Sequence, residues 1–337
     1  MTLPAPLTDL APLINGFWTT QAIYVAAKLG LADLLAEGPL TAVELASRVG
    51  TQPAATHRLL RALASIGLFQ EIDGQRFELT ALAERLKSDS PGSQRAMALM
   101  RGEWQYRAWG ELLHCVQTGG SAFEHLFGLP MFDFLGADPE KGALFDAAMT
   151  SIHGRETTLM LDAYDFSRFG TVVDVGGGNG SLLSAVLLRH PGLRGVLFDL
   201  PTVVERAQAS LAVADLAGRC PLIGGDFFDS VPTGGDAYLL RHIIHDWDDE
   251  QAGRILQNCR RAMIADSTLL LAEFVIPAGN DRFAGKWFDL AMLIGPGGQE
   301  RTAEEYERLL AVSGLRLVRI VPTAGEISVI EAVPTSL

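Results

Sequence analysis

Two histidines and an aspartate stand just after a short apolar run in the C-terminal half of this chain. The run covers residues 237–240, and His242, His245 and Asp246 follow it. A neutral imidazole, with an unperturbed pKa of about 6.5, can accept the proton of a hydroxyl group whose oxygen attacks another molecule. His245, which Asp246 and Trp247 follow directly, is therefore predicted to act as a general base.

Two other interpretations of this segment stay open from the residues alone. His245 could instead pack against the next helix, with Asp248 and Asp249 favouring the N-terminus of that helix. The same two histidines, together with Asp246 and Asp249, could also supply metal ligands. A His-x-x-His pair is a weak signal without a further ligand at fixed spacing, so metal-free chemistry is favoured.

A glycine-rich loop follows a buried strand earlier in the chain. The β-branched run 171–175 contains Asp174 and leads into Gly176, Gly178 and Gly180, after which an apolar helix is predicted over 181–189. Open α/β sheets bind their ligands at the carboxyl ends of their strands. The loop is therefore predicted to hold a nucleotide-type ligand, with a plain tight turn as the alternative.

The spacing of the glycines helps to choose this ligand. A dinucleotide loop reads Gly-x-Gly-x-x-Gly and would need glycine at position 181, where the chain has Ser181. The more compact Gly-x-Gly-x-Gly favours S-adenosylmethionine over NAD, because S-adenosylmethionine has no pyrophosphate to place on a helix N-terminus. Asp199, which ends the next predicted strand, suits hydrogen bonds to ribose hydroxyls in either cofactor.

The elements that must position these residues alternate regularly from residue 171 onward. Alternating strands and helices predict a doubly wound α/β sheet. Only residues 323–326 separate the last two strands, too few for a helical crossover, so these strands are expected to pair antiparallel. Seven strands are predicted, over residues 171–175, 194–198, 221–225, 237–240, 268–274, 316–322 and 327–332.

The N-terminal part has a different pattern, in which short helices precede a hairpin. Thr41 and Glu44 have the spacing of a capping box, and an Asp73–Gly74 turn separates two short strands. This order of elements is a winged-helix pattern. The predicted helices cover residues 14–27, 31–35, 41–49 and 53–66, and the strands cover 68–72 and 76–79.

Winged helices often bind DNA, so this possibility has to be weighed. The candidate recognition helix carries Arg58 and Arg61 but alternates them with alanine and leucine, and no lysine-rich wing follows. The apolar period of that helix favours packing or dimerisation over DNA binding. The apolar positions are Leu59, Leu60, Leu63 and Ile66.

Between these parts, residues 96–164 are rich in large apolar side chains and are predicted to be mostly helical. Such a segment could roof an aromatic acceptor, although methionine and aromatic residues at helical spacing are more often plain core. The chain is thus expected to divide into a winged-helix domain over 1–95, a helical linker and pocket roof over 96–164, and a cofactor-binding domain over 165–337.

Composition narrows the class of protein further. The 27 Lys and Arg residues against 40 Asp and Glu give a net charge of −13, which disfavours nucleic acid and anionic membranes as partners. Cys115, Cys220 and Cys259 form no Cys-x-x-Cys pair, so a reducing, cytoplasmic setting is expected. No signal-peptide pattern and no apolar run near the ~20 residues of a membrane span is visible.

Six segments, in this order and at suitable spacing, resemble the caffeic-acid-type small-molecule O-methyltransferases, which use S-adenosylmethionine. The resemblance covers nearly the whole chain and points to the bacterial secondary-metabolite branch. It implies a Rossmann-like seven-stranded methyltransferase sheet, an N-terminal winged-helix dimerisation domain and a homodimer. The segments are residues 173–180, 198–201, 224–228, 245–247, 272–277 and 297–302.

The resemblance also implies roles for individual residues. His245 would deprotonate the acceptor hydroxyl, and Glu273 and Glu300 match the two acids that hold the imidazole and stabilise the imidazolium. As isolated residues these acids would be no more than a strand-end and a helix-cap carboxylate. Two further sets would bind the cofactor and the acceptor, respectively: Asp174, Gly176, Gly178, Asp199, Asp226, Phe227, Arg241 and Trp247; and Phe145, Met149, Asp246 and Met292.

Two departures from the plant enzymes limit what the resemblance implies about the acceptor. Arg241 stands where plant relatives carry a cofactor-side lysine, and the stretch 291–295 replaces a more polar one. The acceptor is therefore not assignable from plant precedents. In the family the partner's N-terminal helix, here around residues 15–18, closes the acceptor pocket.

Three functions remain at this stage. The leading one is a homodimeric O-methyltransferase that acts on a phenolic or polycyclic aromatic small molecule. A decarboxylase or hydroxylase of the same fold is the second, and the joint presence of His245, Glu273 and Glu300 argues against it. A DNA-binding regulator is the third, and the acidic charge disfavours it.

Overall fold

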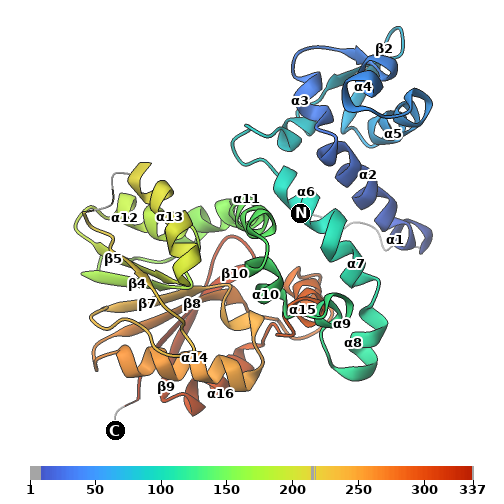
Figure 1. Ribbon diagram of the computed structural model, residues 1–337. Coiled ribbons are helices and arrows are strands. Elements are labelled where there is room, and N and C mark those ends of the chain that lie inside the picture. The colour runs from blue at the N-terminus through green and yellow to red at the C-terminus, as the bar shows by residue number, and fades with distance from the viewer. Residues whose placement is uncertain (1–8, 214–215, 217, 336–337) are drawn as a thin grey trace. The chain divides into compact units, whose positions relative to one another are not determined.

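The computed structural model describes residues 9–213, 216 and 218–335, which form two compact units (Figure 1). One unit contains the residues up to 107 together with 138–152, and the other contains 108–137 and the residues from 153 onward. The helix-rich segment 96–164 is thus divided between the two units. In the described ranges, no helix is both long enough and apolar enough to cross a membrane.

The first unit has the predicted winged-helix order of elements. Thr41 Oγ1 accepts the Glu44 N–H at 3.2 Å and Glu44 Oε2 accepts the Thr41 N–H at 2.7 Å, which confirms the capping box. The sequence missed a short strand that pairs with the hairpin, giving an antiparallel sheet in the order β1-β3-β2. The elements are α1 (Ala11–Ile14), α2 (Gly16–Lys28), α3 (Leu31–Leu35), β1 (Leu40–Thr41), α4 (Ala42–Val49), α5 (Pro53–Ser65), β2 (Phe69–Ile72), β3 (Arg76–Leu79) and η1 (Ala83–Leu86).

The apolar period of α5 buries only part of the expected stripe. Leu60 and Leu63 are fully buried in the core of the first unit, whereas Leu59 is half-buried and Ile66 is 48% exposed. The helices that follow are α6 (Arg95–Met100), η2 (Arg101–Gln105), α7 (Tyr106–Trp109), α8 (Leu112–Thr118), α9 (Ala122–Phe127), α10 (Met131–Gly136) and α11 (Pro139–Ala163).

The second unit is built on the predicted seven-stranded sheet, in the order β6-β5-β4-β7-β8-β10-β9. In this sheet the strands β4 to β8 are parallel to one another. β10 pairs antiparallel with both β8 and β9, which confirms the predicted terminal hairpin. The strands are β4 (Thr171–Val175), β5 (Arg194–Asp199), β6 (Leu222–Gly224), β7 (Ala237–Arg241), β8 (Thr268–Phe274), β9 (Leu315–Pro322) and β10 (Ile327–Pro334).

Successive residues of the central strands point to opposite faces and build two cores. Val172 and Leu239 pack with α12 on one face, while Val173 and Leu240 pack with α14 and α16 on the other. This is the doubly wound α/β architecture that the sequence predicts. The covering helices are α12 (Ser181–Arg189), α13 (Pro201–Val213), α14 (Asp249–Ala262) and α16 (Ala303–Val312) (Figure 1).

The parallel strands bring the candidate site residues to one edge of the sheet. β4, β5, β7 and β8 all end at this edge, where the glycine loop, Asp199, Arg241 and Glu273 lie. His245 and Asp246 follow β7 in the short helix η3 (Ile244–Asp246). The glycine loop that follows β4 and the histidine segment that follows β7 therefore lie at the same edge, as expected for the carboxyl ends of parallel strands.

Candidate active site

The glycine loop needs glycine for two separate reasons. Gly178 has a φ of 58°, a left-handed conformation that other residues rarely adopt. A Cβ atom on Gly176 would lie 2.5 Å from Cδ1 of Ile243, so the backbone can approach the 242–244 segment only without a side chain. The loop therefore brings its backbone amides close to whatever binds at the ends of β4 and β7.

Two acids lie next to this loop and differ in their hydrogen bonding. Asp174 is buried and its Oδ2 has no hydrogen-bond partner among the described residues, and burial raises its pKa to about 7. Asp199 accepts the N–H of Gly178 at 2.8 Å and the N–H of Leu200 at 2.7 Å. An unpaired buried carboxylate oxygen suits a ligand that brings a hydrogen-bond donor or a positive charge.

Aromatic side chains lie beside the same loop. The rings of Phe227 and Phe228 meet Trp247 edge to face, with centroid distances of 6.1 and 4.7 Å. Asn258 donates to the carbonyl oxygen of Phe227, and Asp226 accepts the Phe228 N–H at 2.8 Å. The buried Trp247 Nε1 has no partner within the described ranges. These residues form a half-buried aromatic surface of the kind that holds a flat ring.

Arg241 ends β7 and lies between the loop and helix α11. Its Nη1 donates to Oγ1 of Thr157 at 2.7 Å. Burial lowers the pKa of Arg241, while Asp174 and Glu156 act in the opposite direction. The predicted cofactor-side arginine is therefore held against α11 and faces the acid of β4.

Three carboxylates surround the imidazole of His245. Nδ1 lies 2.7 Å from Glu300 Oε1 and 3.5 Å from Glu273 Oε2, and Nε2 lies 3.5 Å from Asp246 Oδ1. The sequence-based grouping of His245 with Glu273 and Glu300 thus corresponds to a real cluster of side chains. Tethering of Nδ1 by Glu300 leaves Nε2 as the nitrogen that can meet a substrate hydroxyl.

The charge state of His245 differs from the one expected from an unperturbed imidazole. Burial disfavours the imidazolium, but Glu273, Asp246 and Glu300 outweigh it and raise the pKa of His245 to about 10. Burial in turn raises the pKa of Asp246 to about 6 and also raises that of Glu273. The three carboxylates therefore favour the imidazolium form of His245, an effect that the unperturbed pKa used in the sequence analysis does not include.

Two residues that hold this segment had no assigned role in the sequence analysis. Arg301 is fully buried and donates to the carbonyl oxygens of Ile244 and Trp247, on either side of His245. A Cβ atom on Gly298 would lie 2.1 Å from the carbonyl oxygen of His245. Both residues belong to the recognised 297–302 segment, but a contact across more than fifty residues has no signal in local sequence.

The predicted acceptor residues are brought together only in part. Asp246 lies at the imidazole, and Met292 is half-buried on α15 (Gly285–Ile294) of the same unit. Phe145 and Met149 lie on the part of α11 that belongs to the first unit. Their place in an acceptor pocket stays a prediction.

A second cluster, which the sequence did not predict, lies beside His245. His242 Nε2 lies 2.9 Å from Glu156 Oε2, and the His242 ring stacks on that of His153 with a centroid distance of 4.4 Å. His242 has a φ of 53°, a left-handed conformation unusual for a residue with a side chain. The i,i+3 spacing of His153 and Glu156 on α11 was the available signal.

The structure groups the possible metal ligands differently from the sequence analysis. Asp249 pairs with Arg301 at 2.9 Å, whereas His242 and His245 gather with Glu273, and His242 also gathers with His153 and Glu156. Within each of these two groups the ligand atoms lie within 4.8 Å of one another. The near-parallel rings of His153 and His242 cannot both direct an in-plane lone pair at one ion, so the second group is not arranged for a metal.

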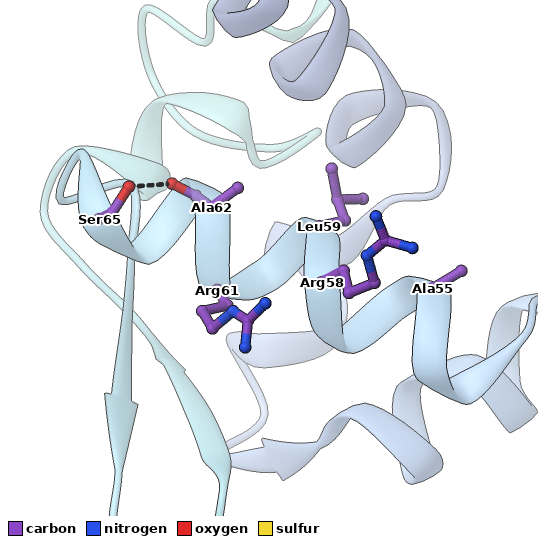
Figure 2. Close-up of a pocket in the computed structure, with 6 residues that line it drawn as sticks. All are labelled: Ala55, Arg58, Leu59, Arg61, Ala62 and Ser65. Atoms are coloured by element: carbon purple, nitrogen blue, oxygen red, sulfur yellow. Dashed lines mark hydrogen bonds between the residues drawn. The ribbon is translucent and has the colours of Figure 1, made fainter.

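A shallow hollow on α5 offers no comparable chemistry (Figure 2). Arg58, Arg61 and Ser65 line it together with small and apolar residues, and both arginines are exposed. The six residues that line this hollow include no acid or histidine. The histidines and acids described above lie instead at the edge of the sheet.

The fold and this site define the chain as a S-adenosylmethionine-dependent O-methyltransferase. The profile of the O-methyltransferase domain matches residues 109–316, and that of the O-methyltransferase dimerisation domain matches residues 11–89. The chain therefore belongs to the O-methyltransferase family, in its bacterial secondary-metabolite branch. Its winged-helix part is a dimerisation domain.

Individual relatives are similar over almost their full length. A phenazine O-methyltransferase of Lysobacter antibioticus is 48% identical over 98% of this chain and 97% of its own length. The crystal structure of LaPhzM, at 48% identity, covers 97% of this chain and 98% of its own with a TM-score of 0.94. An O-methyltransferase from neocarzinostatin biosynthesis, solved with S-adenosylmethionine and 2-hydroxy-5-methyl naphthoic acid, is 34% identical over 98% and 100%, with a TM-score of 0.87.

Proposed function

We propose that this enzyme methylates a hydroxyl group of a phenolic or polycyclic aromatic small molecule, as a homodimer, with His245 as the general base. One observation carries the proposal: His245 Nδ1 is bound by Glu300 at 2.7 Å, and two further carboxylates face the same imidazole. This arrangement orients Nε2 and stabilises the positive charge that forms when the imidazole takes a proton.

The residues around the glycine loop fit S-adenosylmethionine. The unpaired Oδ2 of Asp174 suits the cationic amino-acid end, and Asp199 suits the ribose hydroxyls. Asp226, Phe227 and Trp247 would frame the adenine, and Arg241 would lie at the methionine end with Gly176 and Gly178. When bound, the cofactor supplies a methyl group on a positively charged sulfur.

The chain's own contribution to the reaction is positioning and proton transfer. Nε2 of His245 accepts the proton of the acceptor hydroxyl, and Glu300 keeps the ring in place through Nδ1. Glu273 and Asp246 stabilise the imidazolium. Holding the hydroxyl oxygen in line with the methyl group supplies much of the rate acceleration. Asp246, Met292, Phe145 and Met149 would contact the acceptor.

The relatives support an aromatic acceptor. One is named for a phenazine, and another was solved with a naphthoic acid. In the second unit of this chain, Phe132 lies 5.7 Å from Trp247 between ring centroids, and α15 adds the half-buried Met292. Turnover of hydroxyphenazines, hydroxynaphthoates and single-ring phenols with a labelled methyl donor would test the class, and fused rings are expected to react fastest.

Two substitutions separate the base from the cofactor site. His245→Ala should lower turnover by about 10² to 10⁴ while leaving the Kd for S-adenosylmethionine nearly unchanged. Asp199→Ala should instead weaken cofactor binding first, because the carboxylate faces the loop. Calorimetry and a labelled-methyl assay measure the two effects, with the exposed Glu307→Gln as control. A parallel loss of cofactor affinity in His245→Ala would mark His245 as structural.

A further inference from the structure

The proton that His245 accepts has to leave a buried site. The His245 side chain is only 7% exposed. An imidazole that receives a proton on Nε2 can release one from Nδ1, which faces Glu300 and Glu273. The second oxygen of Glu300 is buried and has no hydrogen-bond partner in the described ranges.

Glu273 offers a path because one of its oxygens faces two imidazoles. Its Oε1 accepts the backbone N–H groups of Ile243 and Ile244, at 3.0 and 2.9 Å. Its Oε2 lies 3.5 Å from His245 Nδ1 and 3.7 Å from His242 Nδ1. Neither Oε2 nor His242 Nδ1 has a hydrogen-bond partner in the described part of the chain. Contacts of this length in a site without substrate often shorten when the site fills.

His242 continues this path to the edge of the site. Its Nε2 lies 2.9 Å from Oε2 of Glu156, on α11. Side-chain exposure rises from 0% at Glu273 to 6% at His242 and 20% at Glu156. His242 has a left-handed backbone, and its N–H donates to the Ala272 carbonyl; unusual backbone conformations of this kind cluster at functional sites.

We propose, on the basis of the function proposed above, that Glu273, His242 and Glu156 form a proton relay that carries the proton from His245 to solvent. The acceptor hydroxyl gives its proton to His245 Nε2, and Nδ1 passes one proton to Glu273 Oε2. His242 receives it on Nδ1 and releases another from Nε2 to Glu156, which gives it to water. One proton leaves the site, and each group returns to its starting charge. Both imidazoles end with the proton on the other ring nitrogen, and exchange of a proton with water after product release restores the starting tautomers for the next turnover.

The surroundings of His242 favour its neutral form. The titratable and charged groups that face it are His153 and Glu156 on α11, Glu273 on β8, and Arg241 and His245 on its own segment. Burial, together with His245 and Arg241, lowers its pKa well below the usual value, so the ring is neutral at rest and a proton gained at Nδ1 has to be matched by one lost from Nε2.

The test compares methyl transfer with proton release in a single turnover. Labelled methyl transfer is followed by rapid quench and the released proton by a pH indicator in weakly buffered solution. In the wild type and in the controls Glu307→Gln and His125→Asn, both exposed surface sites, the two signals should rise together. In Glu156→Gln, proton release should lag behind methyl transfer by roughly tenfold or more, and the lag should disappear with added imidazole buffer.

Two further variants keep the outcomes separate. His242→Asn should show the same lag in proton release. If His242→Asn does not fold, Glu156→Gln still provides the test, because Glu156 lies at the more exposed end of the relay. A Glu156→Gln enzyme without a lag, or with a slowed methyl transfer that buffer does not restore, overturns the relay alone. Wild-type methyl transfer by His245→Ala would overturn the proposed base, and the relay with it.

Discussion

At the scale of single residues, the proposed base makes a prediction about pH, because its carboxylate neighbours favour the charged form of His245. Three carboxylates within 3.5 Å raise its pKa to about 10, so the basic form of the free enzyme increases with pH. We expect kcat/KM for the acceptor to rise by up to about tenfold per pH unit between neutral and mildly alkaline pH. A pH–rate profile with the cofactor saturating measures this limb.

Glu300→Gln tests whether the carboxylates around His245 set the position of the rising limb in the pH–rate profile. The substitution removes one negative partner of the imidazolium, which lowers the pKa of His245, so the rising limb should move to lower pH. The glutamine oxygen can still accept from Nδ1 and keep the ring in place. The exposed Glu307→Gln should leave the limb unchanged. If the rising limb keeps its position in Glu300→Gln, the limb reports ionisation of the acceptor hydroxyl and not of His245.

At the scale of elements, the segment 245–247 is held by a second segment that arrives from far along the chain. Gln299 N–H donates to the His245 carbonyl at 2.8 Å, and Arg301 binds the carbonyls of Ile244 and Trp247. Gly298 lies so close that an added Cβ would be 2.1 Å from the same His245 oxygen. The backbone at position 298 therefore sets where the imidazole stands.

Gly298→Ala should move η3 away from its position and misplace His245. A displacement near one ångström costs about 10² in rate, so kcat should fall by that order. Cofactor affinity should change much less, because the glycine loop lies on other strands. Gly192→Ala is the matched control, since its added Cβ meets nothing within 4 Å. Equal activity of the two variants, with equal melting temperatures, would contradict this picture.

The sequence predicted this architecture well where the signal is local. Strand and helix periods, the capping box at Thr41 and the short connection between β9 and β10 are all local, and the structure confirms them. Other features depend on contacts between segments that are distant in the sequence. They are the left-handed backbone of His242, its hydrogen bond to Glu156, and the hydrogen bond from Arg301 to the Ile244 carbonyl. The raised pKa of His245 was also missed, because it arises from carboxylates brought together only by folding.

At the scale of the whole molecule, the dimerisation domain carries an exposed apolar stripe near its start. Large apolar side chains that face solvent here lie on α1, on the residue before it and on the start of α2, which is typical of a surface that a partner covers. From the resemblance to the family, we expect residues 15–18 of the partner subunit to close the acceptor pocket. The stripe consists of Leu10, Leu13, Ile14, Phe17 and Trp18, which are 69%, 60%, 66%, 48% and 60% exposed.

Trp18→Glu should therefore weaken both the dimer and acceptor turnover. A carboxylate in the apolar stripe has to be desolvated when the partner binds, so dissociation into monomers is expected. Loss of the partner's helix would remove one wall of the acceptor pocket, which should raise KM for the acceptor and leave the Kd for S-adenosylmethionine unchanged. Light scattering and kinetics at one protein concentration measure both, with Val312→Glu, 74% exposed on α16, as control. A monomeric Trp18→Glu enzyme with full turnover would show that each subunit completes its own site.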